Sequence, residues 1–234
     1  AGATAFSTGG TSPCACNVAV HRPHNRTSST DNLVDSMAVA VHSQCNRKAN
    51  SMRVNWKHHQ HYIFLDLEAT CAKDNGFARS ERETIEIGAV ALDAGRVVMG
   101  EFQEYIRPVH HRTLTAFCTE LTGITQRHVD AAAFFPHVFS RFSAWVAMFD
   151  DAFIFSWGHY DRKQLVQDCR RHEIAYDLPK GFADFKNLFF SRQRLLPRQG
   201  LELTLAQLGL RFEGRPHSAL SDAKNTARLF RYLD

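Results

Sequence analysis

Residues 62–70 read Tyr62-Ile-Phe-Leu-Asp-Leu-Glu-Ala-Thr70, a short apolar run with two acids toward its end. A run of this length and composition is typical of a buried β-strand. Because side chains alternate between the two faces of a strand, Asp66 and Glu68 project to the same side. Two neighbouring carboxylates repel each other and are costly to bury, and a divalent cation with oxygen ligands resolves that conflict. The stretch therefore predicts a central strand that carries a candidate metal site.

The spacing of apolar residues predicts the other elements around this strand. Further strands are expected at 85–92, 96–106 and 152–157, with a hairpin turn at 93–95. Helices are expected at 113–121, 134–149, 161–172, 184–190, 201–208 and 218–233. Three strands, a helical stretch, and then strand and helix again predict an α/β fold with a mixed central β-sheet.

The first part of the chain has a different composition from the rest. Residues 1–58 are rich in Ala, Ser, Thr and Asn and lack periodicity, which predicts a disordered low-complexity tail before a folded domain at 59–234. The chain starts at Ala1, and Met37 and Met52 are alternative start positions, so part of this tail can be non-native.

Charge and cysteine content narrow the class of protein. Residues 1–61 hold six Lys and Arg and two acids, whereas residues 62–234 hold 22 of each sign. A domain without net charge is not typical of a protein that coats DNA without sequence preference. It suits an enzyme in which a basic rim that binds substrate balances an acidic metal site. The sequence has no apolar run long enough to cross a membrane and no secretory signal, and we expect its six cysteines to be reduced thiols. These features predict a cytoplasmic protein without membrane contact.

Two later segments carry further candidate residues. Asp161 follows the apolar strand 152–157 and opens a helix, and His217 lies five residues before Asp222 at the start of the final helix. Each position taken alone also fits an ordinary structural role, since acids cap helices and stabilise the positive end of the helix dipole.

The combination resembles the DEDDh exonuclease superfamily. Its pattern is D-x-E on the first strand, an Asp after a later strand, and H-x-x-x-x-D at the last helix, and here Asp66, Glu68, Asp161, His217 and Asp222 fill all five positions. The resemblance covers about residues 62–234. It implies an RNase H-like fold, the DnaQ-like exonuclease fold, in which helices flank a mixed central β-sheet.

Three longer stretches resemble the ERI-1-type branch, which trims RNA 3′ ends. They are Asp66-Leu-Glu-Ala-Thr-Cys71, Phe117-Cys-Thr-Glu-Leu-Thr-Gly-Ile-Thr125 and Gly214-Arg-Pro-His-Ser-Ala-Leu-Ser-Asp-Ala-Lys-Asn225. A fourth, Ser156-Trp-Gly-His-Tyr-Asp161, looks like bacterial members named after KapD. The resemblance implies a 3′→5′ exonuclease that releases nucleoside 5′-monophosphates from RNA or single-stranded nucleic acid. Alternatives are a DNA proofreading or repair exonuclease, an oligoribonuclease, or a non-catalytic nucleic-acid-binding module.

The resemblance also assigns roles to residues. It implies two divalent ions, Mg²⁺ or Mn²⁺, with Asp66 bridging both, Glu68 and Asp222 completing one site and Asp161 supporting the other. His217 is then the general base, since histidine can take a proton near neutral pH.

Substrate contacts follow from the same resemblance. Backbone groups of Ala69 and Thr70 are expected to hold the terminal nucleotide, Phe117 and Leu121 to pack beside its base, and Tyr160 to stack on a base. Phe117 and Leu121 also lie at the spacing of a helix core, which leaves a structural role open for both.

Overall fold

A computed structural model describes residues 55–193 and 198–233. Most of the predicted tail, residues 1–54, lies outside that range. Trp56 falls within the predicted tail, yet it is buried and its ring packs against Tyr62, Phe155 and Phe230. The packed part of the chain therefore includes Trp56, three residues before the expected domain boundary at 59.

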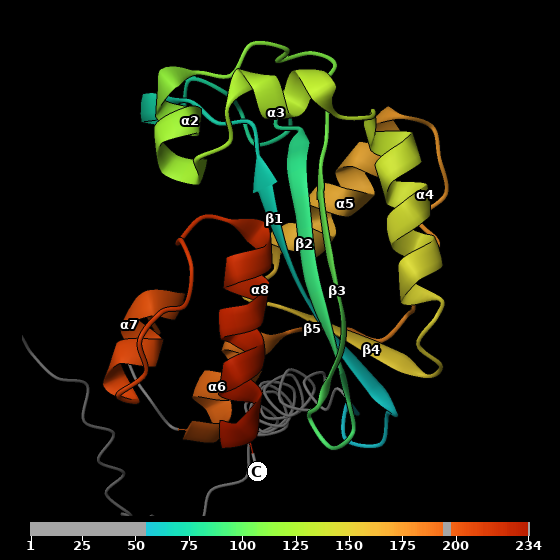
Figure 1. Ribbon diagram of the computed structural model, residues 1–234, viewed down its shortest axis with the longest axis vertical. Coiled ribbons are helices and arrows are strands. Elements are labelled where there is room, and N and C mark those ends of the chain that lie inside the picture. Colours follow the sequence, from blue (N-terminus) through green and yellow to red (C-terminus); the bar gives the residue numbers. More distant parts are fainter. Residues whose placement is uncertain (1–54, 194–197, 234) are drawn as a thin grey trace, which may run out of the picture. The chain divides into compact units, whose positions relative to one another are not determined.

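Five strands form one sheet, as the sequence predicted in outline. They are β1 (His61–Ala69), β2 (Thr84–Asp93), β3 (Val98–Tyr105), β4 (Ala152–Ser156) and β5 (Phe182–Asp184). Their spatial order is β3-β2-β1-β4-β5 (Figure 1). β2 runs antiparallel to both of its neighbours, whereas β1, β4 and β5 are parallel to one another. The predicted α/β fold with a mixed central sheet is confirmed.

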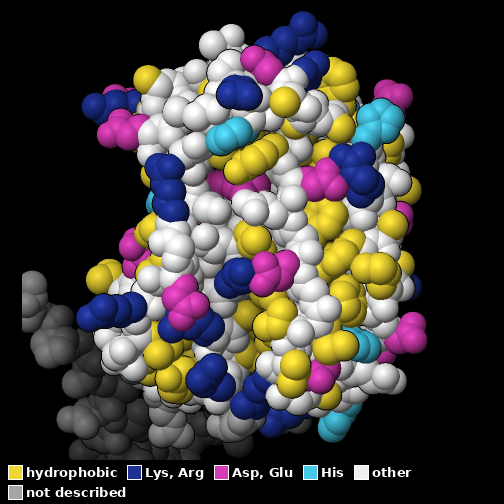
Figure 2. All heavy atoms as spheres, viewed as in Figure 1, with side chains coloured by type: hydrophobic (Ala, Val, Ile, Leu, Met, Phe, Trp, Pro, Cys, Tyr) yellow, Lys and Arg dark blue, Asp and Glu magenta, His cyan; other side chains and the backbone are white. Residues whose placement is uncertain are grey.

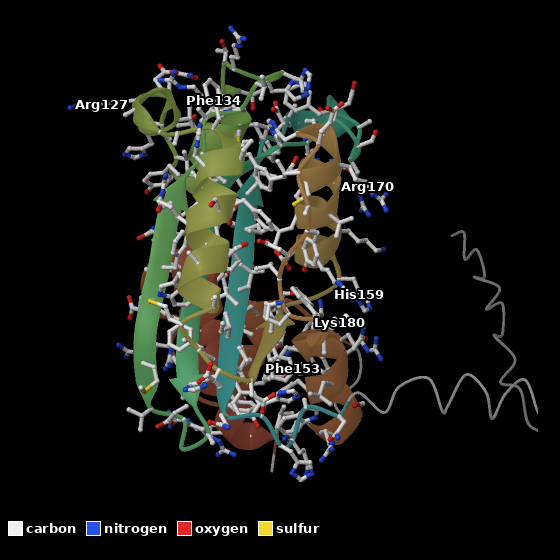
Figure 3. The ribbon with its side chains drawn as sticks, turned by 90° about the vertical axis from the view of Figure 1, so that its right-hand side faces the viewer. Arg127, Phe134, Phe153, His159, Arg170 and Lys180 are labelled. Atoms are coloured by element: carbon white, nitrogen blue, oxygen red, sulfur yellow. The ribbon has the colours of Figure 1, made fainter. Side chains whose placement is uncertain are left out.

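Helices cover both faces of this sheet. They are α2 (Ala116–Thr122), α3 (Gln126–Ala131), α4 (Phe135–Val146), α5 (Tyr160–Arg171), α6 (Phe185–Gln193), α7 (Leu201–Gln207) and α8 (Ala219–Arg228), with short 3₁₀ helices η1 (Lys73–Asn75) and η2 (Leu229–Tyr232). α4 and α5 share one core cluster on one face of the sheet, and they lie side by side in Figure 3. α6, α7 and η2, which continues α8, pack in the cluster on the other face.

The central strand β1 joins these two clusters because both of its faces are buried. Ile63 and Leu65 point into the cluster with α4 and α5, whereas Tyr62 and Phe64 point into the other. Burial of apolar surface on both sides fixes the register of β1, since a slip by one residue would exchange the two faces. The same register decides which face receives Asp66 and Glu68.

Several predicted boundaries were wrong, for local reasons. The helix expected at 113–121 begins at Ala116, because the Thr115 hydroxyl accepts a hydrogen bond from the Cys118 amide (3.0 Å) and so caps it. The strand expected from 96 begins at Val98, because Arg96 adopts a left-handed turn conformation with φ of 69°. The final helix ends at Arg228 and tightens into η2.

Three short elements of the described chain, η1, α3 and β5, were not predicted. Within the described residues, no helix combines the length and the apolar character needed to cross a membrane.

Candidate active site

The pairing of β1 with β4 brings the first three candidate acids together. Leu65 lies beside Ser156, the last residue of parallel strand β4, so the chain that leaves β4 turns into α5 next to Asp66. Asp161 lies in the first turn of α5 and is 4% exposed. Its charge acts on Asp66 and on Glu68, as their pKa shifts show. Residues far apart in sequence thus meet at the end of one parallel strand pair.

The N-terminal turn of α8 brings the last two candidate residues to the same place, and Gly88 makes this possible. Gly88 pairs with Asp66 across β1 and β2. A Cβ atom at Gly88 would lie 2.0 Å from the Leu220 amide nitrogen and 2.2 Å from the Ala219 carbonyl carbon. The backbone of α8 therefore rests directly on the backbone of β2, which only glycine permits.

Glu86 holds the same helix end in position. It is 1% exposed and pairs with Glu68 across the strands. Its carboxylate accepts hydrogen bonds from the Ala219 amide (3.1 Å) and from the Gln103 side chain (2.6 Å). Glu86 was not among the predicted site residues, although an acid inside the apolar run 85–92 is a signal of a buried, partnered carboxylate.

His217 completes the group from the loop before α8. Its backbone is left-handed, with φ of 60°, and its amide donates to an Asp222 carboxylate oxygen at 3.0 Å. Ligand atoms of Glu68, His217 and Asp222 all lie within 4.8 Å of one another. His217 is exposed, so its ring can reach both the acids and a solvent molecule.

The structure thus brings Glu68, His217 and Asp222 to within ligand distance of one another, and Asp66 and Asp161 lie close enough for the charges of these acids to act on each other. Acidic side chains are visible at the surface between α2 and the N-terminal end of α8 (Figure 2).

The electrostatics of the site disfavour four ionised acids. Burial, followed by the charges of Asp161 and Asp222, raises the pKa of Asp66 well above its usual range. Burial and the charge of Asp222 raise the pKa of Glu68 to about 9. Burial likewise raises the pKa of Asp161 to about 7, although hydrogen bonds from its own amide and from Ser156 act in the other direction.

Asp222 follows the same pattern. Burial raises its pKa to about 7, although the hydrogen bond from the His217 amide lowers it. Within residues 55–193 and 198–233, none of the four carboxylates forms an ion pair with Lys, Arg or His. A set of clustered carboxylate oxygens without a protein cation fits hard divalent metal ions, which would supply the missing positive charge.

The predicted substrate residues occupy different environments. Thr70 is fully buried, its amide donates to the Glu83 carbonyl (2.8 Å), and its hydroxyl accepts from the Glu83 amide (3.0 Å). Ala69 is also buried at the end of β1. Phe117 is 37% exposed on α2, whereas Leu121 packs partly against a small core cluster.

α2 is tied to the end of β1 and the segment after it, so it lies beside the end of the strand that carries Glu68. The Thr115 hydroxyl donates to the Cys71 carbonyl (2.7 Å), and the Cys118 thiol contacts the Ala69 carbonyl at 3.7 Å. On the other side, Tyr160 adjoins Asp161, and its hydroxyl donates to Gln164 (3.0 Å). Burial raises the pKa of Tyr160 to about 12, so this hydroxyl stays protonated at neutral pH.

Comparison with known proteins places these features in a family. The sequence matches the exonuclease family RNase_T over residues 63–230. ERI1 exoribonuclease 2 of Danio rerio is 35% identical over 193 residues, covering 71% of this chain and 34% of that protein. The 3′-5′ exoribonuclease 1 of Homo sapiens is 30% identical over 182 residues, covering 74% of this chain and 52% of that protein. The chain thus spans only about a third to a half of the length of these curated relatives.

A solved structure agrees with the sequence matches. The nuclease domain of 3′hExo, a DEDDh family member bound to rAMP, superposes with a TM-score of 0.67 at 30% identity, covering 74% of this chain and 90% of that one. This superposition confirms the predicted RNase H-like fold. By family match, relatives and fold, the chain belongs to the RNase_T exonuclease family, in its ERI-1-like branch of DEDDh nucleases.

Proposed function

We propose that the protein is a metal-dependent 3′→5′ exoribonuclease that removes nucleoside 5′-monophosphates from RNA 3′ ends. The observation that carries this proposal is the grouping of Glu68, His217 and Asp222 within ligand distance of one another, with Asp66 and Asp161 close enough for the charges of these acids to act on each other. A binding module without catalysis has no need for four mutually repelling acids at that place, because their repulsion is costly.

The relatives support RNA as the substrate. Two curated relatives are named exoribonucleases, and a solved relative of 28% identity is described as recognising the 3′ end of a histone mRNA stem-loop. Because this chain covers only part of the curated relatives, the preference for RNA over DNA belongs to the proposal and needs its own test.

The residues divide the chemistry among themselves. Asp66, Glu68, Asp161 and Asp222 would hold two divalent cations, Mg²⁺ or Mn²⁺, which when bound stabilise charge on the scissile phosphate and help to ionise the attacking water. The exposed ring of His217 accepts the proton of that water. The water oxygen bonds to phosphorus, the bond from phosphorus to the 3′ oxygen breaks, and that oxygen takes up a proton from solvent. Asp222 also fixes the His217 backbone through their hydrogen bond.

Phe117 on α2 and Tyr160 at the start of α5 are our candidates for holding the terminal nucleotide. The exposed ring of Phe117 can pack on a base, and such stacking contributes about 1–3 kcal/mol per base. Leu121 would support Phe117 from within α2. Ala69 would contribute through its backbone. Thr70 would act by shaping the strand end, since its amide and hydroxyl are already engaged with Glu83.

The test compares 5′-labelled single-stranded RNA with DNA of the same sequence, each with Mg²⁺, with Mn²⁺ or with EDTA. We expect a metal-dependent ladder that shortens from the 3′ end and forms faster on RNA. His217→Ala should lower kcat by about 10²–10⁴-fold, the usual contribution of a general base. His58→Ala is the matched control, because His58 is exposed and belongs to the segment before β1.

The possible outcomes are distinct. Full activity of His217→Ala would remove the histidine from the mechanism. If the DNA is degraded faster than the RNA, DNA and not RNA is the preferred substrate. An intact, folded protein without any ladder would overturn the proposed function.

A further inference from the structure

A groove runs along α8, the helix whose first turn carries Asp222. It has a volume of about 350 Å³ and lies between α8 with η2 and the hairpin of β2 and β3. Ser221, Lys224, Arg228 and Arg231 line it from the helix side at spacings of three, four and three residues. That spacing places all four on one face of a helix. We call this feature the α8 groove.

The α8 groove combines positive charge with an apolar floor. Arg96 of the hairpin adds a fourth cation to Lys224, Arg228 and Arg231, while Val98 and Ala227 supply apolar surface above the buried Val90 and Leu92. Figure 2 shows Lys and Arg side chains interspersed with apolar ones over the lower half of this face. Such a surface suits a ligand with several negative charges and nonpolar parts, as a nucleotide chain has.

Acids compensate only part of this charge. Lys224 pairs with Glu101 at 2.7 Å, and Arg228 pairs with Glu213 at 3.1 Å. Arg231 is exposed and makes no ion pair with any residue of the part of the chain that the structure describes. The Glu213 side chain is 70% exposed, so its pair with Arg228 is open to solvent and can be exchanged for another anion.

The α8 groove begins at the same turn of α8 that carries Asp222. Ser221 lines the groove, and the next residue, Asp222, belongs to the cluster. The helix rise between residues 222 and 231 corresponds to about 15 Å. A stacked strand rises about 3.4 Å per nucleotide, so this distance corresponds to about four nucleotides.

We propose that the α8 groove binds the sugar-phosphate backbone of the substrate strand on the 5′ side of the terminal nucleotide. This inference rests on the proposed function and deepens it. Lys224, Arg228 and Arg231 contact successive phosphates, Arg96 closes the groove from the hairpin, and the apolar floor packs against ribose or base. The groove holds an RNA of several nucleotides and is out of reach of a dinucleotide bound at the acids.

The test measures binding and hydrolysis separately. The main variant is Lys224→Gln with Arg231→Gln, and the matched control is Lys163→Gln with Arg170→Gln. The control removes the same charge from exposed positions on α5, on the opposite face of the sheet, where Arg170 points away from the domain (Figure 3). Thermal melting of each variant establishes that it is folded.

Binding of a labelled RNA of about twelve nucleotides is followed by fluorescence anisotropy in EDTA, where nothing is cleaved. We expect the main variant to bind about tenfold more weakly at low salt. We also expect the slope of log affinity against log salt to fall by about 0.7 for each lost phosphate contact. Cleavage of a dinucleotide with Mg²⁺ should remain at the wild-type rate. Glu213→Gln, which removes the acid that pairs with Arg228, should bind the long RNA more tightly than wild type.

Three results would overturn the proposal. They are wild-type affinity in the folded main variant, equal weakening in the control variant, or an equal loss of dinucleotide cleavage. A different result would overturn the proposed function alone. In that case the wild-type protein binds long RNA through these residues but cleaves no substrate, and the α8 groove remains an RNA-binding site.

Discussion

Asp66 is the residue at which catalysis and stability are most opposed. Burial and four neighbouring acids raise its pKa, so its ionised form is unfavourable in the folded, metal-free protein. We expect Asp66→Asn to raise the melting temperature in EDTA, because the repulsion disappears. The same change should lower hydrolysis by about two to three orders of magnitude, since a metal ligand is lost. Glu173→Gln, an exposed change at the end of α5, is the control. A lower melting temperature in EDTA would contradict this account.

Glu86 contributes to the site by holding the first turn of α8, and we expect its substitution to change both stability and catalysis. Glu86→Ala leaves the Ala219 amide without its acceptor, which costs about 1–3 kcal/mol for a buried donor. We expect the melting temperature to fall by about 2–10 °C. We also expect kcat to fall more than KM changes, because His217 and Asp222 lose their position. Glu86→Gln keeps an acceptor for Ala219 and should recover part of both losses. Equal melting temperatures and equal kcat values for the Glu86→Ala and Glu86→Gln variants would refute a positioning role of Glu86.

At the scale of single residues, the sequence predicted the motif but not the residues that hold the motif in position. The five motif residues are recognisable because their chemistry requires acids and a histidine in a fixed order. Glu86 and Gly88 were read only as members of a strand, because their importance depends on α8 lying on β2. No local pattern in residues 85–92 shows that contact.

Among the elements, the docking of α8 on β2 decides whether the site exists. Gly88→Ala would place a methyl group 2.0 Å from the Leu220 amide nitrogen, and neither backbone can move away cheaply. We expect the first turn of α8 to shift and kcat to fall by about 10²-fold, the cost of a misplacement of about 1 Å. Gly200→Ala is the control, because nothing lies within 4 Å of its Cβ position. Unchanged kinetics of Gly88→Ala would show that α8 tolerates displacement.

Element prediction succeeded where apolar periodicity was long and failed where it was short. β1, β2, α4 and α5 carry clear apolar patterns and were anticipated. β5 has three residues and α3 has six, too few to show a period. β5 exists because β4 offers it a free edge, which is a tertiary cause that a local pattern does not contain.

For the whole molecule, the acid cluster makes the free energy of unfolding depend on both pH and bound metal. An unfolded carboxyl titrates at about pH 4. In the folded, metal-free protein the pKa of Asp161 and of Asp222 is about 7 and that of Glu68 about 9, so the folded state holds extra protons above pH 4. Stability without metal therefore falls as the pH rises through this window. Metal ions bind the ionised acids, so bound metal offsets this loss of stability at high pH.

We expect Mg²⁺ to raise the melting temperature more at about pH 8 than at about pH 5. With free ion about a hundredfold above its Kd, the gain at the higher pH is about 2.7 kcal/mol, or about 5–10 °C. Melting curves with and without Mg²⁺ at both pH values measure the difference. Equal shifts at the two pH values would show that the acids do not carry the metal.

The placement of α8 also has a consequence for how the protein is made. The first strand of the sheet supplies Asp66 and Glu68, whereas Asp222 arrives only with α8, the last α-helix of the described chain. A nascent chain on the ribosome therefore carries three of the five motif residues, Asp66, Glu68 and Asp161, until synthesis has reached His217 and passed residue 222. Until that point the nascent chain lacks both His217 and Asp222, so it cannot assemble the proposed site beside its own messenger RNA.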